Sequence, residues 1–201
     1  MDNGSLVQLV ERLRSRVRVP QEPINFNGAY MKYKFTDETK NFCGKVLHRI
    51  VCVTAFASVA VGDTGGWVES EKNLSQSGNA WVSGDAWVYG NACVSGDAEV
   101  SGNAWVYGNA KVYGNAKVYG DAKVYGDAKV SKSSDYAVYK NSWSSMRYFT
   151  WTRSNNKWRV GCFYGTGDEL IEKAYKDSQL SGDCYKAVVE MRNKLTELES
   201  A

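Results

Sequence analysis

Hydrophobic and polar positions recur with a six-residue period over residues 78–131. Each of the nine units reads Gly, then Asn or Asp, then Ala-x-Val-x, with Ala at every sixth position from 80 and Val at every sixth position from 82. This alternation puts Ala and Val on one face of a short strand and the two variable residues on the other. Gly accepts a positive φ and Asn or Asp bonds to nearby backbone, so the pair predicts a turn after each strand. The sequence therefore predicts a coil of short strands with Val and Ala inside.

The repeat resembles the hexapeptide repeat of left-handed parallel β-helices, in which an aliphatic residue is followed four positions later by a small one, as Val82 and Ala86 are here. The resemblance implies three units in each triangular coil, and hence three coils from the nine units. Val68 and Leu74 continue the phase of the Ala positions and predict a degenerate coil before the repeat. Many proteins with this repeat trimerise, so the resemblance also implies a homotrimer.

If residues 18 apart stack, the outward positions form three faces, and one of them is aromatic. That face carries Lys123 and five aromatic residues that we predict as contact residues, Trp87, Tyr89, Trp105, Tyr107 and Tyr125. A large aromatic patch on a rigid wall indicates a contact surface. Such a face either packs against another subunit or the chain's own tail, or it stacks a ligand.

The segments on either side of the repeat predict caps, because a solenoid must cover its two ends. Residues 31–77 have strand-like patterns around Tyr33 and Phe35 and over 45–54, which predict an N-terminal β cap. Residues 1–30 contain a short apolar helix pattern, alternating arginines and two prolines. We expect them to be an extension that is not part of the native protein, with Met31 as its start; the alternative is a basic arm for nucleic acid or a membrane.

Residues 132–201 predict a β-hairpin followed by two helices. The hairpin is expected over 147–153 and 157–164 with a two-residue turn at Asn155-Asn156. Its aromatic face, which we expect to cover the open coil, comprises Phe149, Trp151, Val160 and Cys162. One helix is expected from Gly167 and a second after Gly182. The apolar seam of the second helix, suited to packing on the hairpin or on partner subunits, comprises Cys184, Val188, Met191, Leu195 and Leu198.

The distribution of charge points to a local anion site rather than to nucleic acid. The whole chain has a net charge of only +3, too small to indicate a nucleic-acid partner. Residues 132–164, however, hold six basic residues against one acid, among nine aromatics. Basic residues between aromatics can bind single-stranded nucleic acid or nucleotides by stacking and by charge. We predict Arg153, Lys157 and Arg159 as anion contacts, although a hairpin whose cations are simply solvated would show the same pattern.

Residues that could carry out chemistry are few. Hexapeptide acyltransferases use a His general base, and related carbonic anhydrases bind zinc through three His residues, but His48 is the single histidine and lies in the cap. The five cysteines are at least nine residues apart with no CxxC pair, so they predict neither a disulfide framework nor a zinc ribbon. We therefore predict no catalytic residues, no metal and no cofactor. The longest apolar run, residues 50–61, is about half of a membrane span, and we expect a cytoplasmic protein.

Both flanks resemble uncharacterised hexapeptide-repeat proteins of bacteriophages and prophages. The segments that carry this resemblance are LHRI, GDTGGWVE and NLS before the repeat and KWRVGCFYGTGDEL after it. The resemblance implies an accessory protein in the host cytoplasm and no particular activity. We favour a non-enzymatic oligomeric scaffold that binds a host or phage protein or a small nucleotide-like anion, for example in counter-defence. The alternatives are a structural spacer in a phage assembly and an acyltransferase-like enzyme that uses His48 or a carboxylate.

Overall fold

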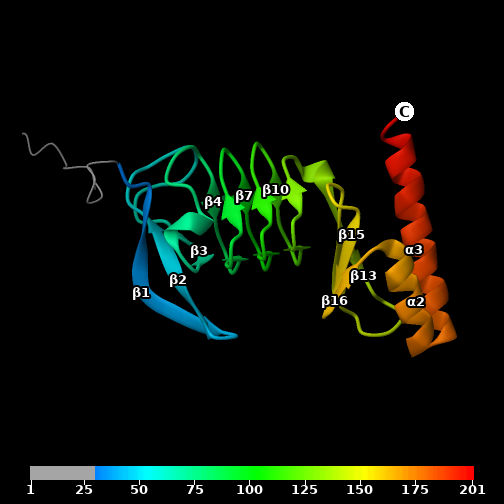
Figure 1. Cartoon of the computed structure of the whole chain (residues 1–201). Coiled ribbons are helices and arrows are strands. Elements are labelled where there is room, and N and C mark those ends of the chain that lie inside the picture. Colours follow the sequence, from blue (N-terminus) through cyan, green and yellow to red (C-terminus); the bar gives the residue numbers. More distant parts are fainter. Residues whose placement is uncertain (1–29) are drawn as a thin grey trace, which may run out of the picture.

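A computed structural model describes residues 30–201, and these form a β-solenoid between two caps (Figure 1). The described chain is mainly β and ends in a module of two helices. In Figure 1 a long β-hairpin lies at one end of the solenoid and the helices lie at the other. The extension predicted over residues 1–30 lies outside the described residues, apart from Tyr30.

The repeat folds as two-residue strands that start every six residues. They are β4 (Trp81–Val82), β5 (Trp87–Val88), β6 (Cys93–Val94), β7 (Glu99–Val100), β8 (Trp105–Val106), β9 (Lys111–Val112), β10 (Lys117–Val118), β11 (Lys123–Val124) and β12 (Lys129–Val130). They sort into three parallel stacks, β4-β7-β10, β5-β8-β11 and β6-β9-β12. Partners such as Val82 and Val100 are directly opposite each other. Each coil therefore holds three units, and side chains 18 residues apart stack.

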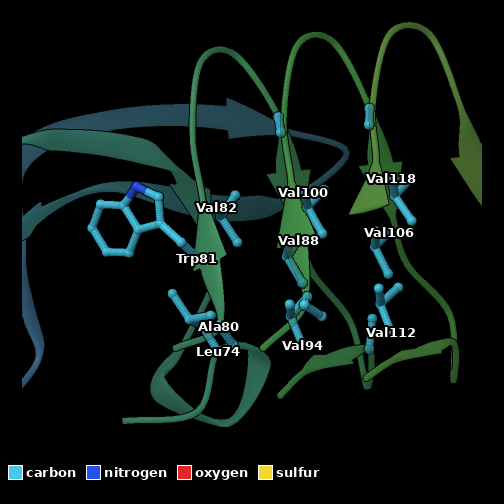
Figure 2. Close-up of a cluster of buried hydrophobic side chains, with 14 of the residues drawn as sticks. Leu74, Ala80, Trp81, Val82, Val88, Val94, Val100, Val106, Val112 and Val118 are labelled. Atoms are coloured by element: carbon cyan, nitrogen blue, oxygen red, sulfur yellow. The ribbon is translucent and has the colours of Figure 1, made fainter. Parts of the chain in front are cut away.

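The Val and Ala residues of the repeat fill the interior, as the alternation predicts (Figure 2). All of them have 0% exposure. The repeat glycines have φ between 63° and 73°, which a side chain would strain. At Gly78 a Cβ would also lie only 2.6 Å from the carbonyl oxygen of Gly96. The predicted corner is thus required both by φ and by the close approach of neighbouring coils.

The solenoid begins before the repeat, but in a different phase from the one predicted. In strand β3 (Thr64–Val68), Val68 pairs with Val88, and Leu74 forms a bridge with Val94. The short 3-10 helix η1 (Glu71–Asn73) lies between them, and the two extra residues of this coil lie after it, between Leu74 and Val82. Val68 and Leu74 therefore occupy Val positions, and their predicted placement in the Ala phase was wrong. Asn73 fastens this coil to the next, since its buried Nδ2 donates to the carbonyl oxygens of Gly90 and Ala92.

The N-terminal cap is an antiparallel hairpin of β1 (Tyr33–Phe42) and β2 (Lys45–Cys52). Strand β2 also pairs with β3 and so extends one stack of the solenoid. Tyr33, the first residue of β1, lies in the same buried core as the first coil. The amine of Lys32 donates to the carbonyl oxygen of Ala80 at 2.6 Å. The amine of Lys32, a residue that is only 5% exposed, thus satisfies a backbone carbonyl at the open end of the first coil.

Burial of Lys32 makes stability depend on pH. Desolvation lowers the pKa of this amine to about 8, whereas the unfolded chain keeps the proton up to a pH of about 10.4. Between these values the unfolded state binds more protons, so the free energy of unfolding rises with pH. We expect a gain of about 2 kcal/mol between about pH 7 and about pH 9.5, measured by urea denaturation. Lys32→Met should lack this gain; parallel pH profiles for the two proteins would contradict the assignment.

The C-terminal sheet has four antiparallel strands rather than two. They are β13 (Tyr136–Lys140), β14 (Tyr148–Thr152), β15 (Lys157–Val160) and β16 (Phe163–Gly165), with the short 3-10 helix η2 (Ser133–Asp135) in front. Thr152 pairs with Lys157, so four residues, 153–156, connect β14 and β15, and the predicted two-residue turn was wrong. The asparagines support this longer turn, because Asn155 accepts from the Thr152 hydroxyl and Asn156 from the Trp151 indole.

The two faces of this sheet are used the other way round from the prediction. The face with Thr150 lies against the last coil, where its hydroxyl accepts from the backbone N–H of Lys123 at 2.8 Å. The aromatic face, with Phe149, Trp151 and Trp158, packs against the helices instead. An open coil end presents unpaired backbone groups, which need polar partners. The apolar sides of the helices pack against the aromatic face. This orientation of the sheet therefore gives the coil end its polar partners and also buries the apolar sides of the helices.

Removing the Thr150 hydroxyl tests this arrangement. We expect Thr150→Val to lower the free energy of unfolding by about 1–3 kcal/mol, because it leaves the Lys123 N–H buried without its acceptor. Thr39→Val, at an exposed strand position, is the control and should change stability little. Equal stability of the two variants in urea denaturation would contradict the assigned orientation of the sheet.

Two helices close the chain, α2 (Gly167–Asp177) and α3 (Gln179–Leu198). Helix α3 starts before Gly182, contrary to the prediction, so Gly182 lies within the helix. A glycine is required at this position because the Tyr175 ring leaves no space for a Cβ. The buried side of α3 includes Tyr185, Val189 and Arg192. The predicted packing of the whole seam on the hairpin was wrong, since Val188 contacts that core but Met191, Leu195 and Leu198 are exposed; its packing on partner subunits stays a prediction. Within the described residues, neither helix is long and apolar enough to cross a membrane.

Candidate anion-binding site

Aromatic side chains stack into two ladders along the face formed by β5, β8 and β11. Trp87 and Trp105 have ring centroids 4.9 Å apart and an interplanar angle of 2°. Tyr89 lies 5.0 Å from Tyr107, and Tyr107 lies 4.4 Å from Tyr125. The parallel register produces both ladders, because it places each residue over its equivalent in the next coil. All five predicted contact residues of this face are thus brought together.

The end of this face near the N-terminal cap is covered by the chain itself. The tip of the β1–β2 hairpin brings Phe42 within 5.1 Å of Trp87 and 5.3 Å of Trp105, measured between ring centroids. Tyr89 and Tyr107 retain only 8% exposure. The cover comes from the N-terminal cap, which the sequence analysis did not place there. Trp87 and Tyr89 therefore serve mainly as packing residues.

Beyond the hairpin, towards the C-terminal sheet, the same face contributes to a cleft of about 520 Å³. We call it the basic cleft. One wall comes from β8 and β11 of the solenoid, and the other comes from the start of β14, from β15 and from the turn after β15. Its lining residues are Trp105, Tyr107, Asp121, Lys123, Arg147, Tyr148, Arg159, Gly161 and Cys162.

Three cations line the basic cleft, and their charges are poorly compensated. Within residues 30–201, Lys123 and Arg147 make no ion pair and no side-chain hydrogen bond. Arg159 donates from Nη1 to the carbonyl oxygen of Cys162, but its buried Nε has no partner among the described residues. Burial lowers the pKa of Lys123, the neighbouring Arg159 and Arg147 lower it further, and Asp121, the one acid in the lining, opposes this shift. The cleft is therefore electropositive.

Aromatic rings hold these cations in place. The Arg159 guanidinium lies 4.8 Å from the Tyr125 ring centroid and 5.7 Å from that of Tyr107. The Lys123 amine lies 4.6 Å from the Trp105 ring centroid, where the next Trp of the ladder would stand. Cation–π contacts of this kind fix a charge without neutralising it. The cleft can therefore accept an anion at its cations and a planar group at its rings.

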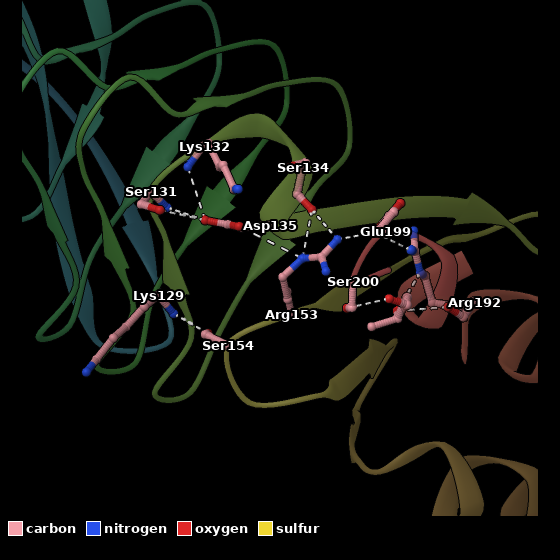
Figure 3. A network of polar contacts seen from close by, with 11 residues as sticks. Lys129, Ser131, Lys132, Ser134, Asp135, Arg153, Ser154, Arg192, Glu199 and Ser200 are labelled. Atoms are coloured by element: carbon pink, nitrogen blue, oxygen red, sulfur yellow. Dashed lines mark hydrogen bonds and ion pairs between the residues drawn. The ribbon is translucent and has the colours of Figure 1, made fainter. Parts of the chain in front are cut away.

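The other two predicted anion contacts do not line the basic cleft. Arg153 forms ion pairs with Glu199 and Asp135 and so links the end of the solenoid to α3 (Figure 3). The amine of Lys157 lies over the Tyr164 ring, 5.0 Å from its centroid. Of the three predicted cations, only Arg159 belongs to the cleft.

Sequence analysis missed Lys123, Arg147 and Tyr148 as members of this site. For Lys123 a signal existed, because the 18-residue stacking places it directly after Trp105 on the aromatic face. Arg147 and Tyr148 precede or begin β14, and no local pattern shows that the solenoid wall lies opposite them.

The one histidine lies away from this site. His48, on β2, packs with its ring centroid 5.2 Å from that of Phe35 and lines no cleft described here. In residues 30–201 no three His, Cys, Asp or Glu side chains are placed to hold a metal ion. The chain matches no protein-family model, and no curated protein matches it.

Proposed function

We propose that this protein is a non-enzymatic binding protein whose basic cleft holds a small anionic ligand with a planar ring, such as a nucleotide. The observation that carries the proposal is the meeting of Lys123, Arg147 and Arg159 in one cleft without an ion-pair partner among the described residues. One further residue of the cleft, the exposed Tyr148, offers a ring surface for stacking, whereas the Trp105 ring is covered by Trp87 and by the Lys123 amine.

An anion in this cleft would relieve an unfavourable arrangement of charge. Lys123 and Arg159 are half-buried, and cations that repel one another in such a position are costly unless a counter-charge satisfies them. A phosphate would accept from the Lys123 amine and from the exposed Arg147 guanidinium, and charge-assisted bonds of this type are the strong ones. A base stacked on an aromatic side chain adds about 1–3 kcal/mol. The two contributions together suit a nucleotide better than a simple inorganic ion.

We further propose that the solenoid is a left-handed β-helix of the hexapeptide type and that the protein acts as a homotrimer. The coil of three short strands with Gly at each corner supports the first point. The resemblance of both flanks to phage proteins supports a phage accessory protein in the host cytoplasm, acting for example in counter-defence. Sedimentation equilibrium tests the trimer, for which the expected mass is three times that of the chain.

Calorimetric titration with ADP tests the binding proposal. We expect one ADP per chain, with an affinity that falls as salt rises, because phosphate contacts by cations are screened. The double variant Lys123→Gln, Arg147→Gln should lose binding. Lys111→Gln, an exposed lysine on another face of the solenoid, is the matched control and should bind as the wild type does. Equal binding by both variants, or no binding by the wild type to ADP, GDP or UDP, would contradict the proposal.

A further inference from the structure

A second cleft adjoins the basic cleft. Its volume is about 330 Å³, and it lies between the end of the C-terminal sheet and helix α2. We call it the polar cleft. It shares Arg147, Gly161 and Cys162 with the basic cleft, so Arg147 lies at the junction of the two. The remaining lining residues are Asn141, Ser144, Ser145, Val160, Phe163, Leu170, Lys173, Ala174, Asp177, Ser181 and Tyr185.

The lining of the polar cleft differs from that of the basic cleft. It has an apolar part that includes Phe163 and Leu170, and three polar side chains that are free to bind. Among the described residues, Ser145, Lys173 and Asp177 make no side-chain hydrogen bond or ion pair. A carboxylate that accepts, an amine that donates and a hydroxyl that does both can satisfy the hydroxyl groups of a sugar. An aromatic ring beside them suits the apolar face of such a ring.

The junction residue explains how one ligand would use both clefts. Arg147 carries a positive charge with no ion pair in the described chain, and its guanidinium can bind phosphate oxygens in pairs. Arg159 and Lys123 lie on one side of it, and Lys173 lies on the other. A negatively charged linker at Arg147 would leave a planar group in the basic cleft and a polar group in the polar cleft.

Building on the proposed function, we propose that the ligand is a nucleoside diphosphate whose terminal phosphate carries a sugar. The base stacks in the basic cleft on Tyr148, the diphosphate binds Arg147 and Arg159, and the sugar occupies the polar cleft beside Asp177. A simple nucleoside diphosphate fills only the first two of these positions. The volumes of the two clefts lie within or near the lower part of the range for ligand sites, about 300–1,000 Å³, so one extended ligand can fill both.

The test compares nucleotides with and without the sugar. Calorimetric titrations of the full chain would use three pairs of probes: ADP with ADP-ribose, UDP with UDP-glucose and GDP with GDP-mannose. We expect at least one sugar-bearing member to bind about tenfold or more tightly than its partner, which corresponds to about 1.4 kcal/mol. Asp177→Asn should reduce that affinity to the level of the simple nucleotide and leave the simple nucleotide unaffected. Asp168→Asn, also on α2 but outside both clefts, is the control.

The outcomes separate this inference from the function on which it rests. If each simple nucleotide binds as tightly as its sugar-bearing partner and Asp177→Asn changes neither, the two-cleft ligand is wrong and the nucleotide site remains. If no probe binds the wild-type protein, the proposed function fails and the inference fails with it. If the sugar-bearing nucleotide binds more tightly but Asp177→Asn has no effect, the sugar lies elsewhere and the polar cleft is not its site.

Discussion

Replacing Arg159 with Gln is expected to weaken nucleotide binding by about 10- to 100-fold, since a hydrogen bond to a charged group contributes about 1.5–3 kcal/mol. The Arg159 guanidinium lies over the rings of Tyr125 and Tyr107, and its Nε is buried without a partner in the described chain. Gln keeps some of the packing but removes both the charge and the fixed fork of donors. The dissociation constant for ADP, measured by calorimetry, checks the prediction.

The molecule contains a matched control for this change. Arg49 also lies over a ring of the same aromatic face, 5.0 Å from the centroid of Trp67, but near the N-terminal cap. It pairs with Asp85, and its guanidinium donates to the carbonyl oxygen of Gly84. Arg49→Gln should therefore leave ADP affinity unchanged. Equal losses of affinity in the two variants would mean that the effect is a general one of charge rather than of the basic cleft.

Replacing Trp151 with Ala is expected to lower the free energy of unfolding by about 3–5 kcal/mol, as for other large buried aromatics. The side chain is 1% exposed, and its indole N–H donates to Asn156 at 2.8 Å. The Arg192 guanidinium of α3 stacks over the same ring, 4.6 Å from its centroid. The substitution would thus remove the contact that joins the sheet to the helices.

Chemical denaturation followed by circular dichroism measures this loss. Tyr148→Ala is the control, because Tyr148 lies on the same strand but is 41% exposed, and it should cost less than about 1 kcal/mol. A loss of similar size in both variants would contradict the packing of the aromatic face of the sheet against α2 and α3.

The solenoid could be predicted from sequence because its determinants are local and repeat. The Val and Ala positions and the Gly corners fix the coil within a few residues, and the same rule applies nine times. The first coil departs from that rule, because two extra residues between Leu74 and Val82 shift Val68 and Leu74 into the Val stack. The period alone does not reveal this shift, since Val68 and Leu74 are six residues apart and fit the Ala positions of the repeat as well as the Val positions.

The C-terminal module shows what a sequence pattern does not determine. The alternation in β14 correctly separates Phe149 and Trp151 from Thr150 and Thr152. It does not state which face meets the coil, and hydrophobicity alone favoured the wrong one. Unpaired backbone groups at the coil end determine the answer, and Thr150 satisfies one of them. The same limit applies to α3, where stacking on Trp151 makes Arg192 a buried residue.

Part of the candidate site could be predicted, because stacking 18 residues apart follows from the repeat. Trp105, Tyr107 and Arg159 line the basic cleft, and all three were singled out from sequence. Arg153 could not be separated from Arg159 by composition, since its ion pair with Glu199 joins residues far apart in the chain. The cleft itself forms between the solenoid and a later sheet, so its shape depends on how these parts meet.

Native mass spectrometry on the protein mixed with equal amounts of several nucleotides tests the central claim most directly, because it reports subunit number and bound mass in one spectrum. The account predicts a nucleotide-sized adduct, one per chain, on the wild-type protein and on Arg49→Gln, and its loss from Arg159→Gln. Equal adducts on all three proteins, or none on any of them, would contradict the assignment of the basic cleft as an anion-binding site.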